Sequence, residues 1–336
     1  MLICFRVKLD IYNMDVLEMP EKKDDHYVSQ TYLKWFIDPN KPANNKDVPG
    51  LLNVYNKKFP KKSKYKTPRQ VCYEVNGDRN SYFPNNPRIL DDFLTIIEPK
   101  WELTISELAQ GIFSSKTKLI ISLYVAYLRG CNPTAKRLGK ALLDIDLVDR
   151  RRVAAKYVKE QMDGCEDNIR LIEDLLSPEV VLGIKPECPH ALAIKNLVLS
   201  GICYFTLPWA IVNNTSSYPF LTSDNPATLI YYPGRNYAET LFLPLTPKLA
   251  ISIFSDDSGY GSQQLLKVSA DAESVEKTNI ELIKSAENII ISNVQADWIS
   301  SLIEKHKNWK MDISNVKVSS NINESIYHVR QYAREK

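Results

Sequence analysis

Apolar residues recur at two different spacings along the chain, and the change in spacing separates a helical region from a sheet-rich one. Between residues 88 and 112 the steps are of three and four, and this helical stripe comprises Leu90, Phe93, Leu94, Ile97, Trp101, Ile105, Leu108 and Ile112. Pro99 interrupts the stripe and predicts either a kink near Glu98 or a new helix that starts with the proline. Helical character continues to about residue 200.

Short apolar runs of β character follow Pro208. The runs WAIV, PFLT, ATLIYY, TLFLPL and LAISIF are separated by turn signals such as SDNP, PG and TP. A helix is predicted for 269–288, then a strand at NIIIS and a helix at ADWISSLIEKH. Nearer the N-terminus, the arms LLNVY and RQVCYEV flank a basic connector and predict a loose hairpin. The predicted class is α+β, with a central helical layer packed on a mixed or mostly antiparallel sheet and an N-terminal β-rich hairpin.

Composition narrows the class of protein. The 336 residues are 44% hydrophobic, enough for a large core, and the longest apolar run near the middle, LIISLYVAYL, is too short to cross a bilayer. The net charge of +3, from 43 basic and 40 acidic residues, does not by itself indicate a nucleic-acid partner. The six cysteines form no CxxC pair and no signal peptide is evident, so we expect free thiols and a cytoplasmic protein without a membrane partner.

Seven sequence blocks occur in an order typical of one known family. They are HYVSQTYLKWF at 26, LLNVYNKK at 51, IIEPKW at 96, AYLRG at 126, PFLTSDNPA at 219, FLPLTPKLAISI at 242 and TNIELIKSAENIIIS at 278. On these blocks, roughly residues 19–293 resemble the domain of unknown function 4238 family. In that family the first block usually has HYVP, and Ser29 stands here where a proline would fix a polyproline-II entry. The resemblance implies an uncharacterised bacterial-type protein and carries no established reaction.

The resemblance also bears on domain organisation. Relatives place the first block close to the initiator, and the form of MPEKKDDHYVS suggests a start at Met19. Residues 1–18 are then an upstream extension, or else an added strand. We expect a single α+β domain over 19–310, with its helical part at about 88–200 and its sheet-rich part at about 202–293, and a C-terminal tail over 311–336.

His26 is the first candidate for chemistry. Its unperturbed pKa suits proton transfer near neutrality, and Asp24 or Asp25 would orient it. Gln30, four residues later, would share its face on a helix. The structural alternative is a histidine that caps or packs against the start of a helix.

Acidic and amide side chains supply the other candidates. Asp224 and Asn225 in TSDNP form a turn, and a turn that ends a strand would also display a carboxylate able to bind a metal or orient a base. Glu98, four residues before Glu102, would hold Mg²⁺ or Mn²⁺ together with Asp224, or would simply face solvent. Arg129 would bind an anionic substrate, or complement a helix dipole.

We predict that these residues meet in one polar cleft between the helical layer and the sheet. In that cleft His26 acts as acid or base with Gln30 beside it, Arg129 neutralises the substrate, and Asn225 donates to an oxyanion. The structural alternative is a buried hydrogen-bonded network that fixes the helices on the sheet.

The basic connector KKFPKKSKYKTPR, residues 57–69, is a separate candidate. It combines six lysines and one arginine with Phe59 and Tyr65 and contains no acid, which would suit a phosphate backbone and base stacking. The predicted contacts to DNA or RNA are Lys57, Lys58, Lys61, Lys62, Lys64, Lys66 and Arg69. A solvated loop is the alternative.

Two functional hypotheses follow. Motifs for nucleotide loops, dinucleotide binding, zincins, hydrolase elbows and zinc ribbons are absent, and no organic cofactor is indicated. The first hypothesis is a phosphodiesterase or nuclease acting on nucleic acid, with or without Mg²⁺ or Mn²⁺, and by analogy in bacterial stress or phage defence. The second is a non-enzymatic binding or interaction protein whose blocks are structural. Neither the oligomeric state nor the pathway follows from the sequence.

Overall fold

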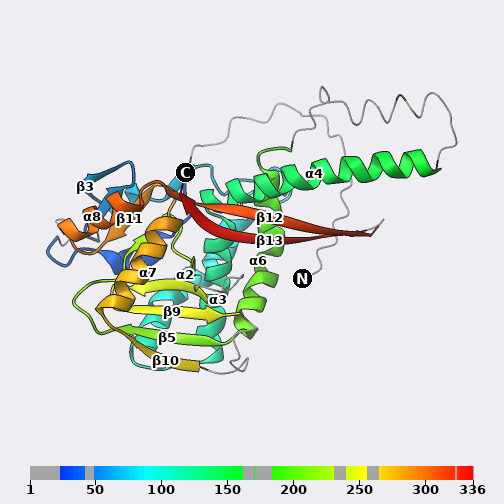
Figure 1. The fold of residues 1–336 in the computed structure, drawn as a ribbon. Coiled ribbons are helices and arrows are strands. Elements are labelled where there is room, and N and C mark those ends of the chain that lie inside the picture. Colours follow the sequence, from blue (N-terminus) through cyan, green and yellow to red (C-terminus); the bar gives the residue numbers. More distant parts are fainter. Residues whose placement is uncertain are drawn as a thin grey trace.

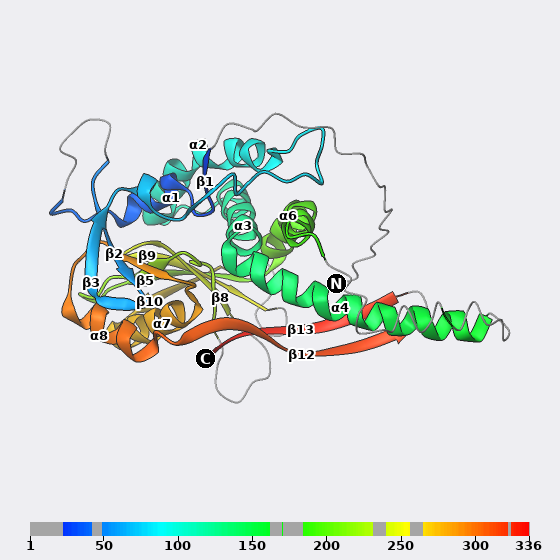
Figure 2. The same cartoon turned by 90° about the horizontal axis from the view of Figure 1, so that it is seen from above.

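The computed structural model describes residues 23–41, 49–161, 170, 184–230, 240–255, 265–321 and 324–335. Helices α2, α3 and α6 cover one face of a five-stranded sheet, and α7 lies on the other face (Figures 1 and 2). The predicted α+β class, with helices packed on largely antiparallel strands, is confirmed. Within the described residues, no helix has the length and apolar character that crossing a membrane requires.

The helices follow the predicted apolar stripes. Their bounds are α1 (Gln30–Leu33), α2 (Ile89–Ala109), α3 (Ser115–Gly130), α4 (Pro133–Gln161), α6 (Cys188–Thr206), α7 (Ala272–Ser285) and α8 (Asp297–His306). Pro99 lies inside α2, so one continuous helix spans the position where either a kink or a new helix was predicted. The apolar face of α2 buries Ile97, Trp101 and Ile105, which anchor the helix from both sides of the proline.

The five-stranded sheet separates two apolar cores. In order, its strands are β10 (Leu265–Ala270), β5 (Trp209–Asn214), β9 (Leu249–Phe254), β8 (Thr240–Thr246) and β7 (Thr228–Ile230). All neighbours are antiparallel except β10 and β5, which run parallel. Because side chains alternate along a strand, Trp209 and Ile211 enter the core under the helical layer while Ala210 and Val212 enter the core against α7.

A four-stranded antiparallel sheet lies beside the first. In order, its strands are β3 (Phe59–Lys66), β2 (Leu52–Asn56), β11 (Ile289–Ser292) and β6 (Thr222–Ser223). Helices α7 and α8 pack on it through a third core that contains Tyr55, Leu282 and Ile303. This sheet contains most of the basic connector, because β3 is formed by residues of that segment.

The N-terminal hairpin exists, but its arms differ from the predicted ones. LLNVY forms β2 and pairs with the basic connector itself, across the two-residue turn at Lys57 and Lys58. The predicted second arm, RQVCYEV, contributes β4 (Tyr73–Val75), which pairs instead with β1 (Asp24–His26). The connector can be a strand despite its lysines and Pro60 because β3 is an edge strand, where both are tolerated.

The C-terminal region also departs from expectation. Residues predicted to be a tail include most of two long antiparallel strands, β12 (Trp309–Asn321) and β13 (Glu324–Glu335). Figures 1 and 2 show this hairpin running alongside α4.

Tyr32 of α1 joins the helical layer to both sheets. Its ring packs beside Phe36, Trp101 and Tyr124 in the largest core. Its hydroxyl donates to the carbonyl oxygen of Pro244 in β8, at 2.7 Å, and lies 2.7 Å from the hydroxyl of Thr222 in β6. Since the tyrosine proton is used on the carbonyl, Thr222 is the donor in the second bond.

We therefore expect Tyr32→Phe to lower the free energy of unfolding by about 1–3 kcal/mol, because it leaves a buried carbonyl and a buried hydroxyl without their partner. Denaturant unfolding monitored by circular dichroism measures this change. Tyr73→Phe, which removes a hydroxyl from an exposed position, is the matched control and should change stability little. Equal stability of the two variants would contradict the linking role of Tyr32.

Candidate functional site

The connection between α7 and β11 is where several of the sequence-predicted residues meet. Lys57 lies there with its side chain buried, only 3% exposed. Its ammonium donates to the carbonyl oxygens of Ile283 at 2.7 Å, Ala286 at 2.9 Å and Trp309 at 2.7 Å. Burial lowers the pKa of Lys57 to about 8. A cation at a helix C-terminus binds carbonyl groups that have no partner within the helix. The ammonium of Lys57 is therefore used inside the protein and differs in this from the other predicted nucleic-acid contacts.

Asp224 holds the other half of the same connection. Its carboxylate, 2% exposed, accepts the backbone N–H groups of Glu287 at 2.8 Å, Asn288 at 2.7 Å and Ile289 at 3.1 Å. Burial raises the pKa of Asp224 to about 6, against the lowering effect of these three bonds. The carboxylate is thus fully engaged with backbone at the start of β11.

Asn225 extends this network to the helical layer. Its amide nitrogen donates to the carbonyl oxygen of Ser285 at 3.0 Å, and its amide oxygen accepts the side chain of Asn132 at 2.9 Å. The amide of Asn132 also donates to the carbonyl oxygen of Leu128 in α3. Both functional groups of Asn225 therefore have partners inside the protein, and the bonds run from α7 to the end of α3.

His26 makes its contacts at the strand pair β1–β4. Its Nε2 donates to the carbonyl oxygen of Arg69 at 3.1 Å, and its ring lies 5.8 Å from that of Tyr73. Burial lowers its pKa, while Asp24 and Asp25 act in the opposite direction. Gln30 begins α1, four residues along the chain.

Ser29 explains how the first block dispenses with its usual proline. Its φ and ψ of −64° and 148° are those of polyproline II, and its hydroxyl caps α1 by accepting the backbone N–H of Tyr32. The same hydroxyl lies 2.9 Å from that of Tyr124. Burial raises the pKa of Glu98 in α2, and the nearby Ser29 side chain acts in the opposite direction.

Arg129 ends α3 and points toward two other elements. Its guanidinium donates to the carbonyl oxygen of Ala227 at 3.4 Å and to the side chain of Gln331 in β13. It therefore contacts the TSDNPA segment through backbone and does not bond to Asp224 or Asn225.

The segment that follows His26 approaches the TSDNP block through neighbours of the proposed catalytic residues, and the common polar cleft stays a prediction. Tyr32 bonds to Thr222, and Tyr27 lies near Cys72 and Asp224, which together with burial raise the pKa of Tyr27 well above its usual value. The polar atoms of Asp224 and Asn225 are occupied by internal bonds. This arrangement corresponds to the structural alternative of a buried network, and the catalytic and metal-binding roles stay predictions.

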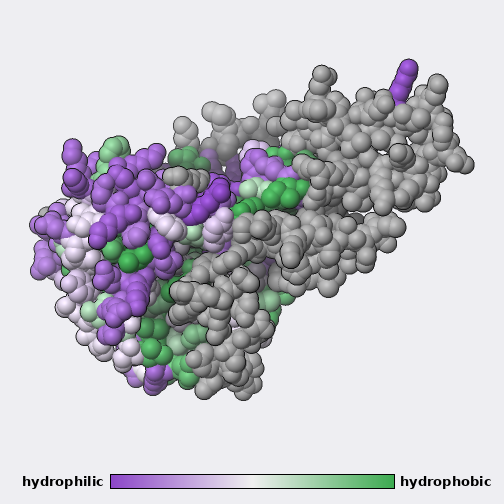
Figure 3. Space-filling model, viewed as in Figure 1, coloured by the Kyte–Doolittle hydropathy of each residue, from purple (hydrophilic) through white to green (hydrophobic). Residues whose placement is uncertain are grey.

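An open groove of about 580 Å³ lies along β3. Val54, Asn56 and Ile289 lie in its wall, and its charged lining residues are Lys58, Lys61, Lys62, Lys64, Lys66 and Glu304. Phe59, also in the lining, is 68% exposed. Figure 3 shows hydrophilic residues gathered over this part of the molecule, where Figure 1 places β3 and α8.

Arg69 and Tyr65 of the basic connector do not line the groove. Arg69 lies past the end of β3, in the short 3₁₀ turn Pro68–Gln70. Tyr65 is partly committed, because its hydroxyl donates to Gln295 at 2.8 Å and the Lys41 ammonium lies 5.1 Å from its ring centre. Phe59 is thus the aromatic side chain of the connector that is free to stack on a ligand.

The chain belongs to the family described as protein of unknown function (DUF4238), whose pattern matches residues 25–296. The match covers most of the chain and includes the α7–β11 connection, strand β3 and His26. No curated protein and no solved structure matched the chain.

Asp224→Asn should lower the free energy of unfolding by about 2–4 kcal/mol, because an amide presents one acceptor to three backbone donors and loses the charge-assisted character of the bonds. Chemical denaturation near pH 7.5 measures it. The matched control is Asp271→Asn, at the exposed N-cap of α7, where the side chain accepts the N–H of Ser274 and asparagine caps equally well. If Asp224→Asn were as stable as this control, the structural role of Asp224 would be wrong.

Lys57→Met should cost about 2–4 kcal/mol of stability, because three buried carbonyl groups lose their donor. Lys58→Met, at the exposed neighbouring position of the same turn, should leave stability nearly unchanged. Thermal and urea unfolding of the two variants side by side provide the measurement. The reverse order of stabilities would show that the ammonium of Lys57 is not needed at the end of α7.

Proposed function

We propose that this protein binds single-stranded nucleic acid, DNA or RNA, in the groove along β3. The observation that carries the proposal is the composition of the groove lining, which has five lysines, one carboxylate and an exposed phenylalanine. Proteins that bind single strands without strong sequence preference combine a positively charged groove with aromatic side chains on which bases stack.

The geometry of β3 suits an extended, flexible ligand. Its eight residues span roughly 26 Å, and lysines on one face recur at roughly 6.6 Å, every second residue. Lys64 and Lys66 have this spacing in the regular part of the β2–β3 ladder, and Lys61 and Lys62 line the groove from the irregular part that precedes it. A single-stranded backbone can follow a straight row of cations with successive phosphates. Phe59 lies at the start of β3, where a base of the bound strand could turn toward the protein and stack on its ring.

The proposal is for binding rather than for phosphodiester hydrolysis. Of the six predicted catalytic residues, none lines the groove. Asp224 and Asn225 are engaged with backbone and with Asn132. The acid of the groove, Glu304, forms an ion pair with Lys307. A role in bacterial stress or phage defence rests on analogy with other families and is not part of the proposal.

Lysines on an edge strand have a second explanation, because they prevent the strand from pairing with another chain. This explanation requires no ligand. Nucleic-acid binding and protection of the strand edge can be distinguished by measuring affinity for nucleic acid and its dependence on salt. Only binding to phosphates predicts a measurable affinity that falls as salt rises, because counterions are released.

We expect the triple variant Lys61→Ala, Lys62→Ala, Lys64→Ala to bind labelled single-stranded oligonucleotides more weakly than the parent. The slope of log affinity against log salt should fall by about 2, because each lost phosphate contact removes about 0.7 for a single strand. Fluorescence anisotropy titrations between about 50 and 200 mM salt measure both quantities. Phe59→Ala should instead lower affinity by about fivefold or more with the slope unchanged, because stacking is not ionic.

The matched control removes three lysines from exposed positions in the helical layer, as Lys100→Ala, Lys116→Ala, Lys195→Ala. It changes the net charge equally but leaves the groove intact, so its salt slope should remain that of the parent. Failure of the parent to bind either DNA or RNA, or equal losses in the two triple variants, would reject the groove as the binding site.

A further inference from the structure

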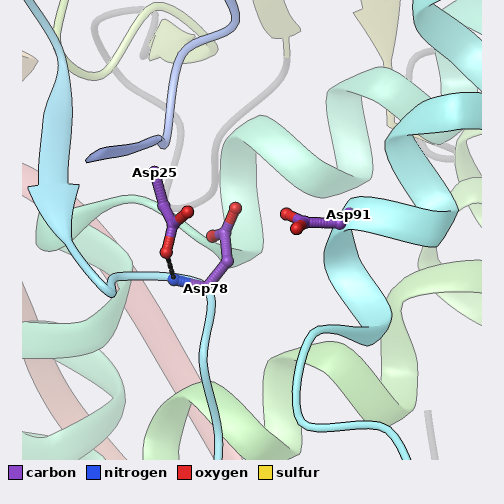
Figure 4. Close-up of side chains that lie close together, drawn as sticks. All are labelled: Asp25, Asp78 and Asp91. Atoms are coloured by element: carbon purple, nitrogen blue, oxygen red, sulfur yellow. Dashed lines mark hydrogen bonds between the residues drawn. The ribbon is translucent and has the colours of Figure 1, made fainter. Parts of the chain in front are cut away.

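Three aspartates from three separate segments converge beside the strand pair β1–β4. Asp25 belongs to β1, Asp78 to the turn that follows β4, and Asp91 to the first turn of α2. One carboxylate oxygen of each lies within 4.8 Å of the others. Figure 4 shows the three side chains directed toward one another, with Asp78 between the other two.

The cationic side chains around this cluster form ion pairs with two of the three carboxylates, those of Asp25 and Asp91. Arg88 bonds to Asp25 at 2.9 Å and to Asp91 at 3.4 Å, and the ammonium of Lys23 lies 2.5 Å from Asp91. The backbone N–H of Asp78 donates to Asp25 at 3.2 Å. These bonds hold Asp25 and Asp91 in place and leave one oxygen of Asp91, Oδ1, without a hydrogen-bond donor among the described residues.

Asp78 is the exception in the cluster. Its residue is 3% exposed, and none of the hydrogen bonds and ion pairs between described residues involves its carboxylate. The charge of Lys136 lowers the pKa of Asp78, but the ammonium of Lys136 donates its hydrogen bonds to Glu74 and to the carbonyl oxygen of Gly77. A largely buried carboxylate without a donor among the described residues is costly, and this one is directed at two other carboxylates.

We propose that Asp25, Asp78 and Asp91 bind one hard divalent cation. Carboxylate oxygens are the preferred ligands of such ions, and three of them here come from rigidly placed segments. Ca²⁺ accepts flexible oxygen geometry at about 2.3–2.6 Å, which suits carboxylates that Arg88 and Lys23 already hold, whereas Mg²⁺ requires about 2.0–2.1 Å and regular octahedral geometry. The site therefore fits Ca²⁺ better than Mg²⁺.

A bound ion would add a link between three segments that hydrogen bonds and ion pairs already join. It would tie β1 to the Asn76–Asn80 turn and to the start of α2, and it would supply the partner that Asp78 lacks. The turn itself begins with Asn76 at a φ of 55°, and the side chain of Asn76 accepts bonds from Lys23 and Arg88. The ion would have its effect on the order and stability of this region, independent of whether the β3 groove binds nucleic acid.

Calorimetric titration of chelator-treated protein with CaCl₂ and with MgCl₂ tests the site. We expect one Ca²⁺ per chain, bound more tightly than Mg²⁺, and a higher melting temperature in CaCl₂. Asp78→Asn should weaken Ca²⁺ binding at least tenfold and abolish the calcium-dependent rise in melting temperature. Without added metal this variant should be at least as stable as the parent, because the amide removes an unpaired buried charge.

Asp92→Asn is the matched control, one residue from Asp91 but bonded to the side chain of Asn86 outside the cluster. It should bind Ca²⁺ as the parent does. If Asp78→Asn fails to fold, Asp91→Asn, at the more exposed side of the cluster, replaces it with the same expected loss. Absence of saturable Ca²⁺ binding by the parent, or Ca²⁺ affinity unchanged in both Asp78→Asn and Asp91→Asn, would overturn the proposal.

Discussion

The buried backbone between α7 and β11 is the constraint on which much of the structure depends. A chain that passes from a helix into a central strand leaves carbonyl groups at the helix end and N–H groups at the strand start, and each must find a partner. Lys57 supplies three donors to the carbonyls, and Asp224 supplies acceptors for three N–H groups. The two side chains are of opposite charge type, and they follow β2 and β6, the two strands that flank β11 in the four-stranded sheet.

This constraint gives the recurring sequence blocks a physical meaning. The LLNVYNKK block contributes Lys57, the PFLTSDNPA block contributes Asp224 and Asn225, and TNIELIKSAENIIIS is the segment that they hold. Lys57, Asp224 and Asn225 are of residue types that often occur in catalytic or binding sites, but here they form hydrogen bonds with backbone groups. Their spacing along the chain is long because the bonds that they make are between elements, so a polar residue in a recurring block is not by itself evidence of chemistry.

Local periodicity made most of the fold predictable, and strand pairing made the remainder unpredictable. The stripe from Leu90 to Leu108 is a property of one segment, and α2 follows it. The partner of a strand is a property of two segments, and β3 shows the difference. Its lysines are typical of a loop, whereas its pairing with β2 places Lys66 and Lys64 opposite Leu52 and Val54. For the same reason β10, most of whose side chains are exposed or half-buried, has no apolar pattern that predicts it.

The basic strand β3 and the cluster of three aspartates differ in the same way, because the first is a property of one segment and the second depends on how several segments pack. The lysines of β3 are contiguous in sequence, so their grouping was predictable from the sequence alone, although burial of Lys57 was not. Asp25, Asp78 and Asp91 are far apart in the sequence and meet only because β1 pairs with β4 and α2 begins beside them. A net charge of +3 conceals both features, since it sums a basic strand and an acidic cluster that lie on different elements. Where a ligand meets a protein, the local arrangement of charge and its burial decide the interaction, and composition alone determines neither.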